Sequence, residues 1–346
     1  MTGFRQCLAL PITAAVAFPV LLTGCTSIGS ERMGIDRSDY ADRLRETNKE
    51  ELLRNIVGMR YGDAPLFLEV TSVISQYTRE GSVRSDLTIA PPPDDSGGSV
   101  GGSVVLRETP TITYTPLSGD RFARSMLSPI PPAALLGMVE AGWTPEVLMR
   151  VAARSINDVD NGSEATLFAH PADPDFERVI GAMGRLHRSG AIAFHVERDG
   201  ERFVARARLS PAPTAQDESD MAFLIERLGL AGGQQGQFAI VFGGSRNAPD
   251  QLSIGTRSMF EIFAEMADGV ELPGDPLPAG PALVRIQSAE SRPGNAHVAV
   301  RQRGRWFWID ADDEKSKLAF LVAQVLLSLG DTSGGANAPL VTIPTG

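Results

Sequence analysis

The chain has 346 residues, 42% of them hydrophobic, and its 42 acidic against 32 basic residues leave a net charge of −10. This length and hydrophobic content are typical of one large or two ordinary globular domains. The acidic balance argues against nucleic acid and anionic lipid headgroups as partners.

The first 25 residues have the three parts of a bacterial secretion signal. Arg5 supplies a positive charge, residues 8–22 are almost wholly apolar, and the small residues Thr23 and Gly24 precede Cys25. The apolar run is shorter than the about 20 residues that a membrane-spanning helix needs, and two prolines interrupt it. The segment therefore predicts a cleaved signal peptide.

The tetrapeptide Leu22-Thr23-Gly24-Cys25 resembles the lipobox of bacterial lipoproteins. The resemblance implies a signal peptide over residues 1–24 and a diacylglycerol linked through a thioether to Cys25. The alternatives are an ordinary secretion signal with a chance cysteine and a retained N-terminal anchor helix. Two acyl chains suffice for stable attachment to a bilayer. By the same resemblance, Thr26 favours the outer membrane, so we expect a protein anchored there and facing the periplasm.

No cysteine is left for other chemistry after this processing. Cys7 would leave with the signal peptide and Cys25 would be lipidated, so the mature chain has no thiol for a disulfide, a nucleophile or a metal ligand. The four histidines do not show the i, i+4 spacing of a helical metal site. We expect no cofactor and no metal.

The next segment combines a linker with the first amphipathic helix. Residues 25–40 are polar and aperiodic, which predicts a flexible tether. Thr47 and Glu50 have the spacing of a capping box, which predicts the start of a helix there. Four apolar residues recur behind it at helical spacing and predict its buried face: Leu52, Leu53, Ile56 and Val57.

Three segments rich in β-branched and aromatic residues, 66–78, 82–89 and 104–114, predict an antiparallel β-meander. Gly81 marks a turn between the first two. Residues 91–103 are Pro, Asp, Gly and Ser without periodicity, which predicts a loop.

Helices with proline at their first turn are predicted to follow, over residues 131–141 and from Pro145 onwards. The polar residues 157–173 then predict a domain boundary. On this basis residues 41–157 form a first folded part with the helix, the meander and further helices, and residues 173–346 form a second, α+β part.

The second part alternates predicted strands and helices. Asp199-Gly200 joins two strand-like runs and is a strong hairpin signal. Residues 315–329 carry an apolar stripe and predict a last helix. The predicted fold class is therefore α+β: an N-terminal helix and an antiparallel β-meander with helices, followed by an antiparallel sheet covered by helices. The other strands of that sheet are expected at 238–242, 252–255, 283–287, 298–302 and 305–309.

The strongest candidate for a binding surface lies near the C-terminus. Strand alternation places Trp306 and Trp308 on the face opposite Phe307. We expect the last helix to cover Phe307 and leave the tryptophans partly exposed beside Arg301 and Arg303. Such Trp and Arg surfaces are common hot spots of binding. The alternative is that another helix covers both tryptophans and the arginines are solvated edge charges.

Three acidic residues, Asp310, Asp312 and Asp313, follow this strand. They have the composition of a catalytic or cation-binding group, and we include Asp310 in the candidate surface. The same position suits acids for another reason, because the N-terminus of the following helix favours negative charge.

Several stretches are similar to an uncharacterised family of Gram-negative bacterial lipoproteins. The similarity covers most of the mature chain and implies membrane attachment but no activity or catalytic residues. The stretches that carry it are residues 48–57, 60–63 and 110–119 with Phe122, residues 130–132, 141–143, 155–157 and 308–310, Ser316-Lys317 and residues 339–344.

Two functions follow from these patterns. The first is a lipid-anchored, non-enzymatic protein that binds or scaffolds another envelope protein. Its contact would be the candidate surface around Trp306 and Trp308, called the tryptophan surface below. The alternative is a hydrolase of envelope material that uses the acidic residues near Asp310. A carrier of transported ligands is a third possibility, and it requires a deep apolar cleft.

Overall fold

The computed structural model divides the chain into two units, Met1–Glu50 and Glu51–Gly346, which are described separately. Residues 1–24, predicted to be a signal peptide, and Cys25 lie outside the described residues, so their processing stays a prediction. The structure describes residues 28–88, 97–165, 169–199, 202–211, 213–231, 233, 236–246, 248–274 and 282–331.

Helix α1 (Ile28–Arg60) runs across the division between the units. The tether predicted at residues 25–40 is wrong from residue 28 onwards, because this segment is helical. Strong helix formers such as Glu, Arg, Met, Ala and Leu extend the helix toward the N-terminus. Thr47 is no N-cap: it lies inside the helix, where its hydroxyl donates to the carbonyls of Arg43 and Leu44.

The C-terminal end of α1 belongs to the second unit and carries the apolar face that the sequence predicts. Leu52, Leu53, Ile56 and Val57 are at most 2% exposed and join the hydrophobic core. The helix ends in a turn with Gly62 at a φ of 83°, a left-handed conformation that glycine adopts without strain.

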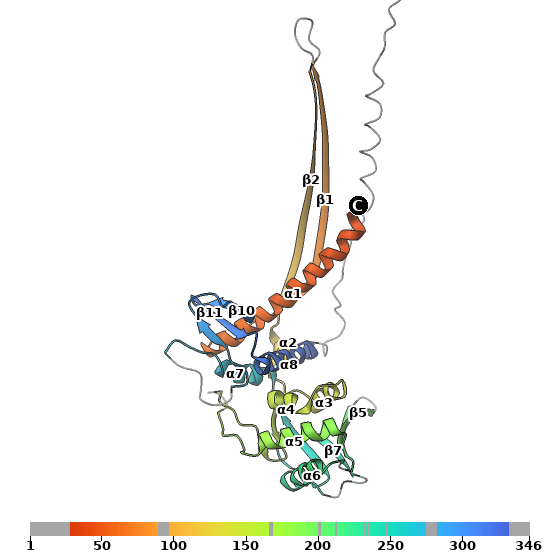
Figure 1. Ribbon diagram of the computed structural model, residues 1–346, viewed down its shortest axis with the longest axis vertical. Helices are drawn as coiled ribbons and strands as arrows, with labels where there is room; N and C mark the ends of the chain where they lie inside the picture. The colour runs from red at the N-terminus through yellow and green to blue at the C-terminus, as the bar shows by residue number, and fades with distance from the viewer. Residues whose placement is uncertain are drawn as a thin grey trace, which may run out of the picture. The chain divides into compact units, whose positions relative to one another are not determined.

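Strands β1 (Leu68–Thr88) and β2 (Gly97–Pro116) form one long antiparallel hairpin (Figure 1). The expected three-stranded meander is therefore wrong. Gly81 does not turn the chain but pairs with Val104 inside the ladder, and the predicted loop is strand from residue 97 onwards. At the base of the hairpin, the Leu117 N–H donates to the Phe67 carbonyl at 2.9 Å.

Short helices connect the hairpin to the main sheet. A helical turn (Gly119–Phe122) continues into a π-helical turn (Ala123–Leu127), and the two predicted helices follow as α3 (Pro132–Glu140) and α4 (Pro145–Ala152). Both have proline in the first turn, where a backbone N–H would have no acceptor within the helix, so the missing N–H of proline costs nothing. Their buried residues include Leu135, Leu136, Leu148 and Met149.

The main sheet has six strands in the order β4-β3-β8-β7-β6-β5. It is mixed rather than antiparallel as expected, because β7 and β8 pair in parallel. The strand bounds are β3 Ala153–Ile156, β4 Val159–Asp160, β5 Ile192–Asp199, β6 Arg202–Leu209, β7 Gln237–Phe242 and β8 Gln251–Thr256.

The predicted boundary at residues 157–173 contains part of this sheet. Asn157 and Asp158 have φ values of 42° and 66° and form the tight turn between β3 and β4. Asn157 is 3% exposed. Its side-chain amide nitrogen donates to the Leu228 carbonyl, and its side-chain oxygen accepts from the Ser253 N–H. Strand β3, from the first predicted part, thus pairs with β8 from the second.

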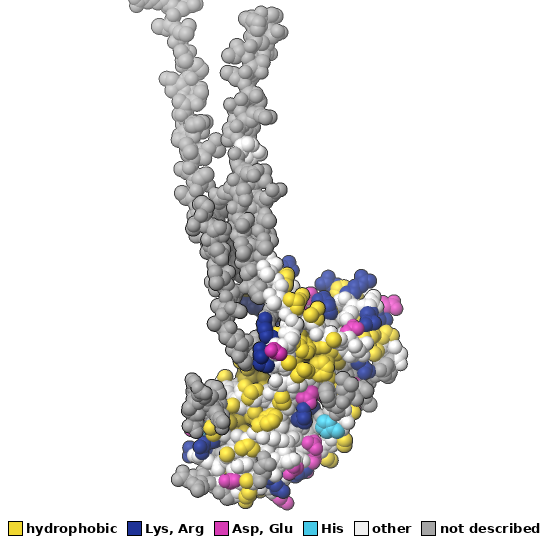
Figure 2. All heavy atoms as spheres, turned by 180° about the vertical axis from the view of Figure 1, so that it is seen from behind, with side chains coloured by type: hydrophobic (Ala, Val, Ile, Leu, Met, Phe, Trp, Pro, Cys, Tyr) yellow, Lys and Arg dark blue, Asp and Glu magenta, His cyan; other side chains and the backbone are white. Residues whose placement is uncertain are grey.

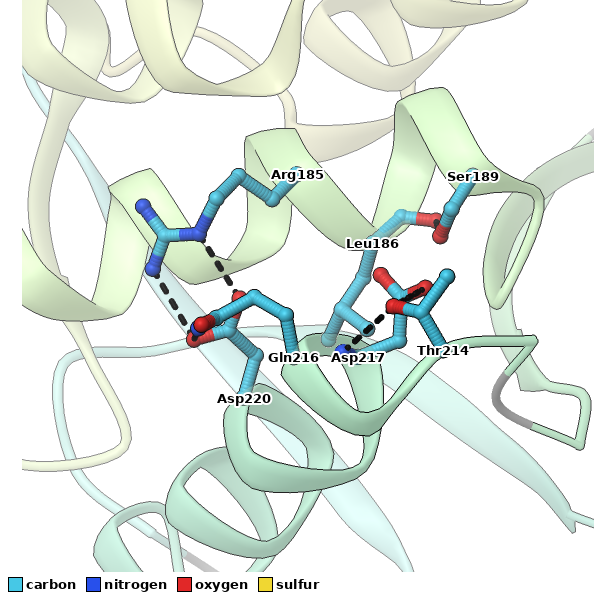
Figure 3. A network of polar contacts seen from close by, with 7 residues as sticks. All are labelled: Arg185, Leu186, Ser189, Thr214, Gln216, Asp217 and Asp220. Atoms are coloured by element: carbon cyan, nitrogen blue, oxygen red, sulfur yellow. Dashed lines mark hydrogen bonds and ion pairs between the residues drawn. The ribbon is translucent and has the colours of Figure 1, made fainter.

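Helices α5 (Phe176–Ser189) and α6 (Ala215–Arg227) pack together and bury Met183 and Leu224 over the sheet. Figure 3 shows the polar contacts that join them. The Arg185 guanidinium donates two hydrogen bonds to Asp220, at 2.7 and 2.9 Å, and these bonds lower the pKa of Asp220. The Thr214 hydroxyl caps α6 by accepting from the Asp217 N–H.

Helix α7 (Met259–Asp268) begins with a complete capping box between Ser258 and Glu261. The last helix, α8 (Glu314–Asp331), agrees with the prediction within two residues. In the described part of the chain, no helix combines the length and apolar character needed to cross a membrane. The fold class α+β is confirmed.

Candidate functional site

The tryptophan surface lies on a separate three-stranded sheet in the order β10-β11-β9. Its strands are antiparallel and comprise β9 Gln287–Ala289, β10 Ala296–Gln302 and β11 Arg305–Asp310. The segment expected as a strand at residues 283–287 enters β9 only at its last residue. Val284 and Ile286 before it are fully buried.

One face of this sheet is core, as the alternation predicts. Phe307 and Ile309 are 0% exposed, and α8 packs against β11. The Tyr61 ring meets Phe307 edge-on at 6.2 Å between centroids. Burial of Phe307 and Ile309 places Trp306 and Trp308 on the opposite face, because neighbouring residues of a strand point to opposite sides.

Trp306 and Trp308 are both partly buried, which agrees with the expected partial exposure and not with complete cover by another helix. Trp306 lies directly across from Arg301 on β10 and Ala289 on β9. Trp308 lies across from Ala299 and Gln287.

Two guanidinium groups flank Trp306. Arg301 is exposed at the position opposite it, and the Arg292 guanidinium carbon lies 5.3 Å from the centre of the Trp306 ring. At this distance the cation is attracted to the negative face of the indole. Sequence reasoning missed Arg292, because it lies in the loop between β9 and β10 and only the fold brings it over the ring.

Arg303 has a different environment from that of the tryptophans. It lies in the β10–β11 turn with a φ of 50°. Its guanidinium contacts both carboxylate oxygens of Asp63, at 3.1 and 3.0 Å, and lies 4.6 Å from the Tyr61 ring centre. These contacts hold the turn against the segment that follows α1, so Arg303 has a structural partner within the chain.

The acidic residues are engaged by their own neighbours. An Asp310 oxygen accepts from the Asp312 N–H at 2.9 Å, and an Asp312 oxygen accepts from the Asn295 amide. Asp313 accepts from the Ser316 N–H at 3.1 Å and from the Ser316 hydroxyl at 2.7 Å. Asp313 is therefore the N-cap of α8, in agreement with the helix-terminus alternative.

The electrostatics of Asp313 agree with this capping role. Burial raises the pKa of its carboxyl, but the hydrogen bonds from Ser316, together with the charge of Arg285 and the Lys315 N–H, outweigh burial, and the pKa is lowered overall. A stabilised carboxylate of this kind is a poor proton donor near neutral pH. Among the described residues, no group of three or more His, Cys, Asp or Glu side chains is arranged to hold a metal.

A second apolar feature was not singled out in the sequence. Trp143, in the turn before α4, and Val147, in the first turn of α4, form a groove of about 360 Å³ with Leu318 and Leu321 of α8. Leu318 and Leu321 are 39% and 44% exposed. Figure 2 shows hydrophobic side chains gathered on one face of the described region, with Lys and Arg among them. The groove is open and shallow, unlike the deep cleft of a ligand carrier.

No protein-family model matches the chain, and neither a curated protein nor a solved structure matches it significantly.

Proposed function

We propose that this chain is a lipid-anchored protein of the bacterial cell envelope that binds or scaffolds another envelope protein without catalysing a reaction. The attachment is through Cys25, and the location is the periplasmic face of the outer membrane. Support for both comes from the order of charge, apolar run, small residues and cysteine at the N-terminus.

The observation that carries the binding role is the pair Trp306 and Trp308 on the face of the small sheet opposite its buried core. Large, rigid aromatic side chains contribute much contact area at little entropic cost, and Trp and Arg dominate the energetics of many interfaces. Arg292 and Arg301 add positive charge to a chain that is acidic overall. The complementary partner surface is an apolar pocket bordered by carboxylates.

The hydrolase alternative is less well supported, because its candidate acids have structural partners. Asp313 caps α8, and Asp310 and Asp312 accept hydrogen bonds from neighbouring donors. Neither the apolar cavity under α5 and α6 nor the groove beside α8 is lined by these residues.

The binding proposal is tested by in-cell crosslinking and purification of the full-length lipoprotein. The variant Trp306→Ala/Trp308→Ala is expected to lose a specific envelope partner that the wild-type chain recovers. Phe242→Ala is the matched control, since Phe242 is an aromatic residue on the main sheet that is 60% exposed. Equal recovery by wild type and the double variant would refute the tryptophan surface.

The anchor is tested separately. Cys25→Ala, or treatment with the signal peptidase inhibitor globomycin, is expected to leave the precursor uncleaved. Unchanged processing would refute the lipoprotein assignment without bearing on the tryptophan surface.

A further inference from the structure

The β1–β2 hairpin is far longer than the fold requires. Its ladder pairs residue 68 with 116 and continues to residue 88 paired with 97, with one irregularity between Val70 and Ser72. A strand of this length spans roughly 65–70 Å at about 3.3 Å per residue. Among the described residues, no third strand pairs with either of its outer edges.

A hairpin of this kind gains little stability when it stands alone. Two strands without a third strand or a packed face are at best marginally stable in water. Each outer edge also presents a row of unpaired backbone N–H and C=O groups that can accept another strand. Exposed edges are commonly blunted by lysine or proline. Strand β1 contains neither over its 21 residues, and β2 contains no lysine and has proline only at residues 110 and 116.

The described side chains of the hairpin distinguish its two faces. The hydroxyls of Ser82 and Ser103 lie 2.7 Å apart across the ladder. Ile112 and Tyr114 lie on the other face of β2, since they differ from Ser103 by an odd number of residues. Ile112 is 39% exposed and Tyr114 is 54% exposed, so apolar surface faces solvent there.

We infer that copies of this chain associate through their hairpins, with the β1 edge of one copy hydrogen-bonded to the β2 edge of the next. A partner strand must have about 20 extended residues and a free edge of its own, and a second copy of the hairpin has both. This pairing continues the antiparallel order and points all hairpins in the same direction. Because each copy keeps one free edge, the contact is heterologous and builds assemblies of several copies.

The size of the contact fits this occupant. An edge of roughly 65 Å, with a contact about 10 Å wide, the thickness of one sheet layer, buries roughly 650 Å² per copy, which is within the range of about 600–1,000 Å² per partner of a standard stable interface. A shorter strand from another protein would leave most of the edge unpaired. The inference is independent of the proposed tryptophan surface.

The test measures the mass of the full-length lipoprotein in mild detergent by light scattering and native mass spectrometry. The wild-type chain is expected to form oligomers. Replacement of residues 73–111 by a short Gly-Ser turn keeps Phe67, Leu117 and the base of the hairpin, and is expected to give monomers with unchanged thermal unfolding of the remaining core. Monomeric wild type, or a shortened variant that still assembles, overturns the inference.

Two further variants keep the test decisive if the shortened chain folds poorly. Ser82→Cys/Ser103→Cys locks each hairpin internally by a disulfide and leaves its edges free, so the oligomer is expected to persist. Loss of the oligomer would instead indicate strand exchange between copies and overturn the edge contact. Trp306→Ala/Trp308→Ala is expected to keep the wild-type mass, and its conversion to monomer would place the contact at the tryptophan surface.

Discussion

The buried Arg257 provides the sharpest test of how the second unit is held together. It lies between β8 and α7 and is 5% exposed. Its guanidinium donates to three backbone carbonyls, those of Arg150, Val151 and Gly162, at 3.3, 3.2 and 2.6 Å. Burial lowers the pKa of Arg257, while Glu265 and Glu261 oppose that shift by favouring its charged form.

Arg257→Ala would create a cavity and remove the guanidinium that donates to the Val151 and Gly162 carbonyls. The Arg150 carbonyl would keep its hydrogen bond from the Asn161 side-chain amide, at 3.0 Å. An unpaired buried polar group costs about 1–3 kcal/mol, and removal of one partner from a buried charged network costs about 3–5 kcal/mol. Relief of the desolvated charge and entry of water offset part of the sum. We therefore expect the free energy of unfolding to fall by about 3–5 kcal/mol.

The assay is urea unfolding followed by far-UV circular dichroism and tryptophan fluorescence. With an m value of about 3 kcal/mol/M, the midpoint is expected to fall by about 1 M or more. Arg154→Ala is the matched control: Arg154 also pairs with Glu261, but its side chain is 47% exposed, so its loss should cost less than about 1 kcal/mol. Equal losses for the two variants would refute the assigned role of Arg257.

Substitutions at three other sites test the fold, and Gly274→Ala serves as the control for one of them. Asp313→Asn keeps an acceptor for capping but does not titrate. Because the folded pKa of Asp313 is lowered, wild type loses this stabilisation as pH falls below about 4, and the variant should show a flatter pH dependence of its unfolding midpoint. Gly162→Ala should cost more than about 2 kcal/mol, because φ is 71° and a Cβ would lie 2.6 Å from the Ala172 backbone; Gly274→Ala, with a φ of 82° and open space, should cost only about 1–2 kcal/mol by the same urea assay. Asp220→Asn should lower the free energy of unfolding by about 1–2 kcal/mol. The loss is no larger because the Arg185 side chain is 43% exposed and water screens the pair. A loss near zero would contradict the role of this pair.

Local sequence signals predicted the helices of the second unit well. Proline at the first turn marks α3 and α4. This signal acts within one turn of the chain, so it is visible without knowledge of the fold. The capping-box spacing, another local signal, failed at Thr47, whose hydroxyl bonds back to its own helix.

Pairing between residues far apart in the sequence determined which segments became strands and how they form the sheets. Gly81 is typical of a turn, yet it stays extended because the ladder with β2 continues on both sides of it. The strands β3 and β4 are too short to show a recognisable pattern, and they form because β8 pairs with β3 and Asn157 bonds across the sheet. Neither partner lies within 90 residues along the chain.

At the candidate surface, too, some features follow from the local sequence and others from long-range contacts. The sequence alone determined the alternation that separates Phe307 and Ile309 from Trp306 and Trp308, because side chains of a strand point to opposite faces whatever the fold. It also contains the complete N-terminal pattern on which the proposed anchor rests. Only the tertiary structure decided that Arg292 lies over Trp306 and that Arg303 pairs with Asp63. These contacts depend on loops, turns and helix ends meeting in space, which no local periodicity encodes.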